Sequence, residues 1–189
     1  GRPITFALSQ HDQAPDQWKE LLDLALNAWD AGIPIRPQIA GRPTGLLLGL
    51  QTFHPLLMRP SYQAIAHLPL AERVAEMKKP AVRKAILSEK VTNADDRMSF
   101  IGMGLDRVFP IGNPPDYEPA PETSIAAQAE RLGIDQMELF YDLLLEDQGA
   151  SLLVRPLLGY SNFSFEPIRE MLLHPTTALG LGDGGAHVG

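Results

Sequence analysis

The sequence contains no cysteine, which excludes disulfide bonds, thiolate zinc sites and cysteine nucleophiles together. Histidine and carboxylate side chains are therefore the strong metal ligands that remain. Long apolar runs are also absent: the longest, residues 45–50 (Gly-Leu-Leu-Leu-Gly-Leu), is far too short to span a bilayer. The first residues show no basic segment followed by an apolar core, so no export signal is visible. We expect a cytoplasmic protein that does not enter a membrane.

Basic patches are absent as well. The net charge is −7, the isoelectric point is about 5.2, and the lysines and arginines are scattered along the chain. A nucleic-acid backbone would be repelled by such a chain, so we expect no nucleic-acid partner. With 189 residues, 44% of them hydrophobic, the chain is long enough to bury a core of its own.

The first forty residues predict a strand, a helix and a second strand. Residues 4–10 form a compact apolar run of strand length, and residues 33–39 form another. Between them, apolar residues recur at helical spacing from Trp18 until Gly32, which is expected to end the helix. A strand, helix and strand this close together favour two parallel strands, although Pro34 and Pro37 weaken the second one.

Helices separated by prolines dominate the middle of the chain. The proline-rich residues 106–119 are expected to form an ordered loop, and residues 151–155 are a weaker strand candidate. A short helix over residues 166–173 leads to a final strand at 177–181. The other predicted helices cover residues 61–67, 69–78, 80–90, 124–132 and 135–147.

The most informative stretch is the last one, where the final strand runs into a glycine-rich loop. Its acid, Asp183, lies between Gly182 and Gly184, with Gly185 following. Composition alone favours a surface turn, because glycine and aspartate are ordinary turn residues. A carboxylate at the end of a buried strand can also bind a metal or move a proton, since active sites gather where parallel strands end.

Two segments carry a family resemblance. Residues 169–189 read Arg-Glu-Met-Leu-Leu-His-Pro-Thr-Thr-Ala-Leu-Gly-Leu-Gly-Asp-Gly-Gly-Ala-His-Val-Gly, and residues 109–119 read Phe-Pro-Ile-Gly-Asn-Pro-Pro-Asp-Tyr-Glu-Pro. Both resemble the N-acyl-D-amino-acid deacylase branch of the metal-dependent amidohydrolases. The resemblance implies an α/β fold, namely part of a (β/α)8 TIM barrel with a helix-rich insertion. Residues 1–45 would be a barrel unit, residues 46–150 the insertion, and residues 151–189 the final barrel unit.

The resemblance also implies an activity. The enzyme would hydrolyse a linear amide C–N bond in a small molecule such as an N-acyl-D-amino acid. It would use a divalent metal, zinc, with Asp183 as the general acid/base close to that metal or as one of its ligands. Amide hydrolysis needs such a group to take a proton from water and pass it to the leaving nitrogen.

One position departs from the family. Where relatives carry Ser-His at the end of a metal-binding strand, this chain has Ser9 and Gln10, with His11 one residue later. Because successive strand residues point to opposite faces, His11 is expected to turn away from the site. Two alternatives remain: the metal is held without this ligand, or the geometry of the turn brings His11 back.

Other polar residues have both a functional and an ordinary interpretation. His187, in the same loop as Asp183, either lines the pocket or packs within the loop. Arg42 either binds a substrate carboxylate or is a solvated loop arginine. Tyr117 and Glu118 are lid candidates, with loop anchoring as the simpler role. The remaining histidines, His54, His67 and His174, are expected on the surface or at helix ends.

The chain begins without methionine and stops six residues after Asp183. We therefore expect part of a longer enzyme, inactive by itself and prone to self-association through open strand edges. An alternative of a different class is a non-catalytic α/β module that binds an anion or small molecule through backbone N–H groups of the glycine-rich residues 182–189.

Overall fold

The computed structural model describes residues 2–89 and 104–180, and the chain divides into two compact units. Unit 1 comprises residues 1–46 and 156–189, and unit 2 comprises residues 47–155. These divisions fall beside the boundaries expected after residues 45 and 150. Each unit is described by itself below.

Unit 1 is built on three parallel strands. Strands β1 (Ile4–Ala7), β2 (Ile35–Ile39) and β6 (Ala178–Leu179) lie in the order β1-β2-β6. Ile4 pairs with Ile35, and Gln38 pairs with Ala178, in parallel register. The prediction of three parallel strands is confirmed, although each strand is shorter than the apolar run that suggested it.

Pro37 lies within the central strand of this sheet, a position that proline normally avoids because it lacks an N–H. The register explains why it is tolerated. Gln38 O accepts a hydrogen bond from Leu8 N on the β1 side, and Ile39 O accepts one from Gly180 N on the β6 side. Residues alternate between neighbours along a parallel strand, so Pro37 faces β6, which begins level with Gln38. The missing donor therefore falls where β6 has not yet begun.

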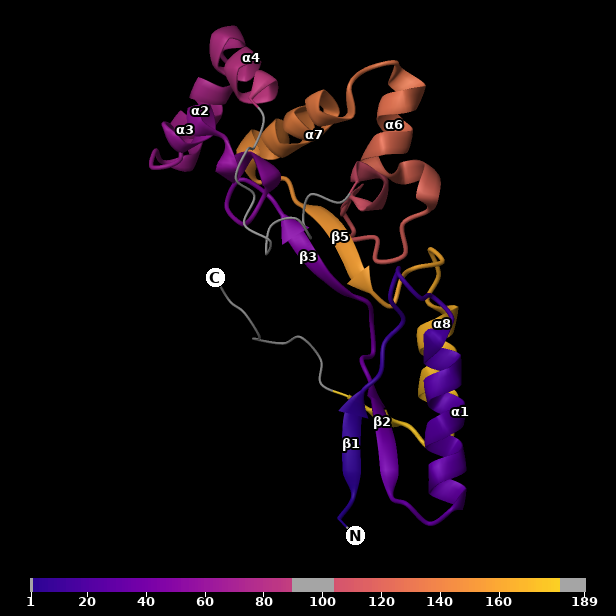
Figure 1. The fold of residues 1–189 in the computed structure, drawn as a ribbon. Helices are drawn as coiled ribbons and strands as arrows, with labels where there is room; N and C mark the ends of the chain where they lie inside the picture. Colours follow the sequence, from indigo (N-terminus) through magenta and orange to yellow (C-terminus); the bar gives the residue numbers. More distant parts are fainter. Residues whose placement is uncertain (1, 90–103, 181–189) are drawn as a thin grey trace. The chain divides into compact units, whose positions relative to one another are not determined.

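Two helices cover one face of this sheet (Figure 1). Helix α1 (Gln17–Asp30) buries Trp18, Leu22 and Ala25, which are spaced to share one helical face. Helix α8 (Glu166–Leu173), which begins and ends at the predicted residues, buries Ile168 and Met171. Trp18, Leu22, Ile168 and Met171 form the core of unit 1 together with Leu8 and Ile39. Each fully buried side chain of this size contributes about 1.5–3 kcal/mol.

Gly32 ends α1 as predicted. Its φ of +78° is in the left-handed region that favours glycine, and its N–H donates to Trp29 O at 2.9 Å while Ile33 N donates to Ala28 O at 2.9 Å. The chain turns directly from the helix into β2.

Unit 2 contains most of the helices and most of a second sheet. This sheet has the order β3-β5-β4, with β4 antiparallel to β5. Strand β4, with the fully buried Phe109, lies inside the stretch predicted to be an irregular loop. The elements are β3 (Thr44–Leu48), α2 (Pro60–Gln63), α3 (Leu70–Met77), α4 (Pro80–Ser88), β4 (Phe109–Pro110), α6 (Ile125–Leu132), α7 (Gln136–Leu145) and β5 (Leu153–Leu158), with 3-10 turns η1 (Pro55–Met58), η2 (Leu105–Arg107), η3 (Pro121–Thr123) and η4 (Glu146–Gly149).

Local sequence signals place the hairpin of α6 and α7. Gly133 ends α6 with a φ of +67°. The Asp135 carboxylate then accepts hydrogen bonds from Met137 N at 2.8 Å and Glu138 N at 3.2 Å, which caps α7. The Glu138 carboxylate lies 3.9 Å from the Arg83 guanidinium. Asp135 thus supplies the N-cap acceptor for α7.

The fold is mixed α/β, as predicted. The described residues form two three-stranded sheets and do not close a barrel. Among residues 2–89 and 104–180, no helix is long and apolar enough to cross a membrane.

Candidate functional site

The carboxyl ends of β1, β2 and β6 lie at the same end of the sheet in unit 1, because the strands are parallel. This end of the sheet is called its carboxyl edge. Gly180 N donates to Ile39 O at 2.7 Å, so β6 leaves the sheet beside the end of β2. A Cβ on Gly180 would lie 3.1 Å from Ile39 O and 3.3 Å from Gln38 Cβ. Glycine thus permits the close approach of residue 180 to the end of β2.

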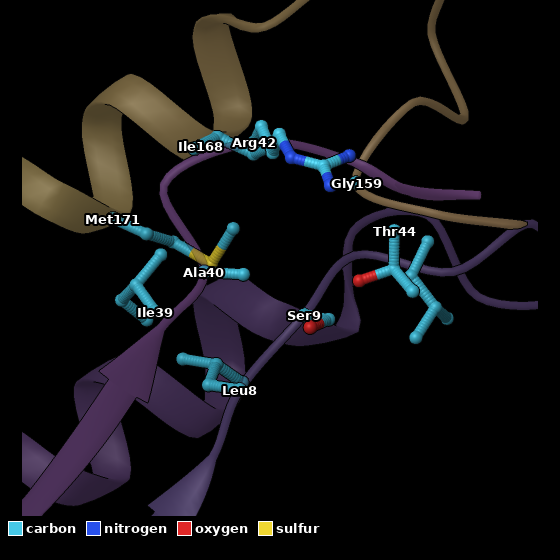
Figure 2. Close-up of a pocket in the computed structure, with 10 residues that line it drawn as sticks. Leu8, Ser9, Ile39, Ala40, Arg42, Thr44, Gly159, Ile168 and Met171 are labelled. Carbon is cyan, nitrogen blue, oxygen red and sulfur yellow. The ribbon is translucent and has the colours of Figure 1, made fainter. Parts of the chain in front are cut away.

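A small cavity lies at this edge (Figure 2). Its volume is about 10 Å³, which is room for about one water molecule. The polar side chains around it come from the segments that follow β1 and β2. The lining residues are Leu8, Ser9, Ile39, Ala40, Arg42, Thr44, Leu158, Gly159, Ile168 and Met171.

Arg42, the predicted substrate-binding residue, is exposed and lines the cavity. Figure 2 shows its guanidinium extending along the rim toward Gly159, and its Nη1 donates to Pro43 O at 3.4 Å. A guanidinium carries five donors in a planar fork that matches a carboxylate. The position suits the predicted interaction with a substrate carboxylate.

Ser9 and Thr44 also line the cavity, and sequence reasoning did not select them as site residues. Neither residue type is distinctive in a loop. The signal that could have found them is their position, because Ser9 closely follows β1 and Thr44 lies five residues after the end of β2.

Gln10 is fully buried and engaged in hydrogen bonds. Its Oε1 accepts from Ser161 N at 3.1 Å, and its Nε2 donates to Pro15 O at 3.2 Å. A metal ion would have to compete with both interactions at a site with no exposed surface. Gln10 in this arrangement does not fit a metal ligand.

His11 is partly exposed and is not among the residues that line the cavity. Its Nε2 is 3.0 Å from Gln17 Oε1. Since an amide oxygen only accepts, Nε2 carries the proton in this pair. No group of three or more His, Asp or Glu side chains that could hold a metal is present in the part of the chain that the structure describes. Gln10 and His11 therefore do not form a metal site by themselves.

The two predicted site residues of the glycine-rich loop, Asp183 and His187, lie outside the described residues. Tyr117 and Glu118 belong to unit 2, where Tyr117 is 54% exposed and the Asp116 carboxylate accepts from Glu118 N at 2.9 Å. That contact is the kind expected of loop anchoring. His174 is the residue that follows α8, with its Nδ1 2.9 Å from Thr176 Oγ1, as expected for a histidine at a helix end.

Unit 2 contains a buried polar cluster that the sequence did not predict. His54 and Tyr62 are both fully buried, with Nε2 of His54 2.9 Å from the Tyr62 hydroxyl. Arg73 Nη1 donates to the same hydroxyl at 3.2 Å. The hydroxyl thus accepts from Arg73, and its remaining lone pair and its proton let it accept from His54 or donate to it, according to the His54 tautomer.

Burial, with a smaller contribution from the charge of Arg73, lowers the pKa of His54 to about 3. His54 precedes η1, so it is at a helix end as expected, but the expectation of a surface position is wrong. The signal available in the sequence was its setting between Phe53 and Pro55-Leu56, which is apolar. The ring packs edge-on against Tyr62, with centroids 4.7 Å apart.

A wider groove of about 500 Å³ lies between α4 and α7 in unit 2. Its walls carry both signs of charge: Arg83 and Lys84 come from α4, and Asp135 and Glu138 come from the start of α7. Arg83 forms a bidentate pair with the Asp142 carboxylate and lies over the Tyr141 ring, 5.1 Å from its centroid. Asp135 is occupied in capping α7. The groove thus has no uniform charge that would select one class of ligand.

No family model matches the chain, and neither a curated protein nor a solved structure matches it.

Proposed function

We propose that the chain is part of a metal-dependent amidohydrolase of the (β/α)8-barrel type that hydrolyses a linear amide C–N bond, such as that of an N-acyl-D-amino acid. The observation that carries the proposal is the shared edge of β1, β2 and β6. At this edge Ile39, three residues before Arg42 in the sequence, accepts a hydrogen bond from Gly180, three residues before Asp183 in the sequence. The family resemblance of residues 109–119 and 169–189 supports it.

In this proposal Asp183 is the proton carrier. It would accept a proton from the attacking water and deliver it to the leaving nitrogen, which prevents expulsion of an amide anion. Arg42 would bind the substrate carboxylate through its fork of donors and so orient the scissile amide. His187 would line the same pocket. The resemblance implies a divalent metal, zinc, but Gln10 and His11 do not fit it, so these steps use only the chain's own side chains.

The test is the substitution Asp183→Asn in the full-length enzyme. We expect kcat on an N-acetyl-D-amino acid to fall by about 10²–10⁴ because the general acid/base is lost. Metal content, measured in both proteins, should not change. Asp30→Asn is the matched control, since Asp30 is an exposed aspartate at the end of α1 and should keep full activity. If Asp183→Asn retains more than about a tenth of the wild-type rate with unchanged metal content, the loss is far smaller than general acid/base catalysis predicts. Asp183 would then be only a turn residue.

A second candidate function is favoured by the hydrogen bonds of Gln10, which occupy the position where the family has a metal-binding histidine. In this alternative the chain is a non-catalytic α/β module, and backbone N–H groups of residues 182–189 bind an anion without metal. Calorimetric titration with phosphate and with an N-acetyl-D-amino acid, done once with added zinc and once with a chelator, distinguishes the two. Tight binding without turnover under both conditions would favour the module, and turnover only with zinc would exclude it.

A further inference from the structure

Gln10 connects the end of β1 to the start of α1 and to a distant segment near Ser161, which is 151 residues away in the sequence. Its main-chain carbonyl accepts from Gly159 N at 2.8 Å, and its side-chain oxygen accepts from Ser161 N at 3.1 Å. Its side-chain nitrogen donates to Pro15 O at 3.2 Å, in the turn that leads into α1. The neighbouring His11 forms a β-bridge with Leu158. One buried residue thus ties the segment after β5 to the end of β1 and to the start of α1.

The segment that Gln10 holds forms one wall of the cavity. Leu158 and Gly159 both line it, opposite the residues that follow β2. Gly159 has a φ of +81°, and a Cβ there would lie 2.8 Å from Ile168 Cδ1 and 3.4 Å from Pro43 Cα. The backbone is therefore tightly packed on α8 and on the Arg42-Pro43 segment. A shift of residues 158–161 would change the space around Arg42.

The two side-chain bonds of Gln10 match an amide. One terminal atom must accept and the other must donate, and both are buried. A glutamate would keep the acceptor for Ser161 but would direct a carboxylate oxygen at the Pro15 carbonyl, and an alanine would leave both partners without this residue's bonds. A buried donor or acceptor that loses its partner is costly. The amide is thus matched to its two partners.

We infer that Gln10 is a positioning residue: it holds residues 158–161 at the carboxyl edge of the parallel sheet, where they shape the pocket around Arg42, and it binds no metal. Its consequence for catalysis rests on the proposed function, whereas the positioning itself rests on the geometry alone.

Hydrogen exchange of backbone amides tests the positioning in the 189-residue chain. In Gln10→Ala, Ser161 N–H should exchange at least about tenfold faster, because its acceptor is gone. The amide of Leu22 in the middle of α1 should be unchanged. Gln13→Ala removes an exposed glutamine three residues away and should change neither. In Gln10→Glu, Ser161 N–H should stay protected while the Pro15 carbonyl ¹³C resonance shifts. Equal exchange of Ser161 N–H in wild type and Gln10→Ala would overturn the inference.

Zinc titration of the same proteins tests whether Gln10 binds a metal. Its first measurement uses the wild type. The side-chain NH₂ resonances of Gln10 in the wild type should not move when zinc is added. A carboxylate is a stronger zinc ligand than an amide, so a metal-binding position would bind zinc more tightly in Gln10→Glu. We expect no gain in affinity. Movement of the Gln10 NH₂ resonances, or tighter zinc binding by Gln10→Glu, would overturn the assignment.

The full-length enzyme supplies a readout that lost stability alone would not change. Gln10→Ala should raise KM for an N-acetyl-D-amino acid severalfold, because the wall beside Arg42 moves. The pH profile of kcat, which Asp183 sets, should stay the same. If Ser161 N–H exchanges faster in Gln10→Ala but KM is unchanged, the effect on the pocket is refuted. If the enzyme has no amidase activity the proposed function fails, and the exchange and zinc results still decide the role of Gln10.

Discussion

Replacing His54 with glutamine should remove a large pH dependence from the stability of unit 2. His54 is fully buried beside Tyr62 and Arg73, and burial lowers its pKa to about 3. An unfolded histidine has a pKa of 6.5. Between these two values the unfolded state binds more protons than the folded state, so the free energy of unfolding decreases as the pH falls. The contribution of neutral His54 to the free energy of unfolding is fully present above pH 6.5 and is lost progressively down to pH 3.

The size of the effect follows from the difference between the two pKa values, 6.5 − 3 = 3.5. At 1.36 kcal/mol for each pKa unit, His54 accounts for about 5 kcal/mol of stability lost over the whole range, of which about 3 kcal/mol is lost between pH 7 and pH 4. Glutamine does not titrate and can accept the proton of the Tyr62 hydroxyl. The wild type should therefore lose about 3 kcal/mol more than His54→Gln over that interval.

Urea unfolding at several pH values measures this difference. Trp18 and Trp29, the two tryptophans of the sequence, are both in unit 1, so their fluorescence reports on unit 1. Helical circular dichroism, after the fluorescence transition is accounted for, reports on unit 2. His67→Gln is the matched control, because His67 is exposed and should leave the acid dependence unchanged. Parallel pH profiles for the wild type and His54→Gln would refute the reasoning.

Two further predictions concern unit 1. Gly159→Ala and Gly32→Ala both place alanine at a positive φ, but a Cβ meets Ile168 Cδ1 at 2.8 Å in the first and no atom within 4 Å in the second. Both substitutions should lower the free energy of unfolding by about 1–2 kcal/mol. Gly159→Ala should lower it by about 1 kcal/mol more, because its Cβ overpacks the core. Equal unfolding midpoints for the two variants would contradict the packing argument. The chain should also self-associate at micromolar concentration, because Leu179, Ile4 and Ile33 are 74%, 55% and 52% exposed beside the strand edges. Light scattering should show less association for Leu179→Lys than for the control Ala71→Lys. The control adds the same charge at an exposed helix position of unit 2. A monomeric wild type would refute the prediction.

Much of unit 1 could be predicted from the sequence because its signals are local. The spacing of Trp18, Leu22 and Ala25 marks the buried face of α1, and Gly32 marks its end. The short link between the two apolar runs requires a crossover and hence parallel strands, which the register confirms. Strand lengths were overestimated, since apolar character continues through Leu8 although pairing stops at Ala7. Apolar residues indicate which positions are buried, whereas the length of a strand depends on how many of its residues pair with the neighbouring strand.

The strand candidate at residues 151–155 overlaps β5, but the pairing of the second sheet could not be predicted in the same way. Phe109 pairs with Val154 across more than forty residues, and the prolines around Phe109 locally favour a loop. Pairing over such a separation depends on how the intervening helices pack, which no local pattern records.

The sequence by itself determined that the chain has an α/β fold, that its parallel strands end at one edge, and that Arg42 follows one of those ends. These properties depend on periodicity, glycine and proline, which act over a few residues. Only the tertiary structure decided what Gln10 and His54 do. Both are polar residues whose type suggests a surface or a ligand, and both are fully buried. Their partners Ser161 and Arg73 are supplied by other elements, because a buried polar group is stable only where folding brings a matching donor or acceptor to it.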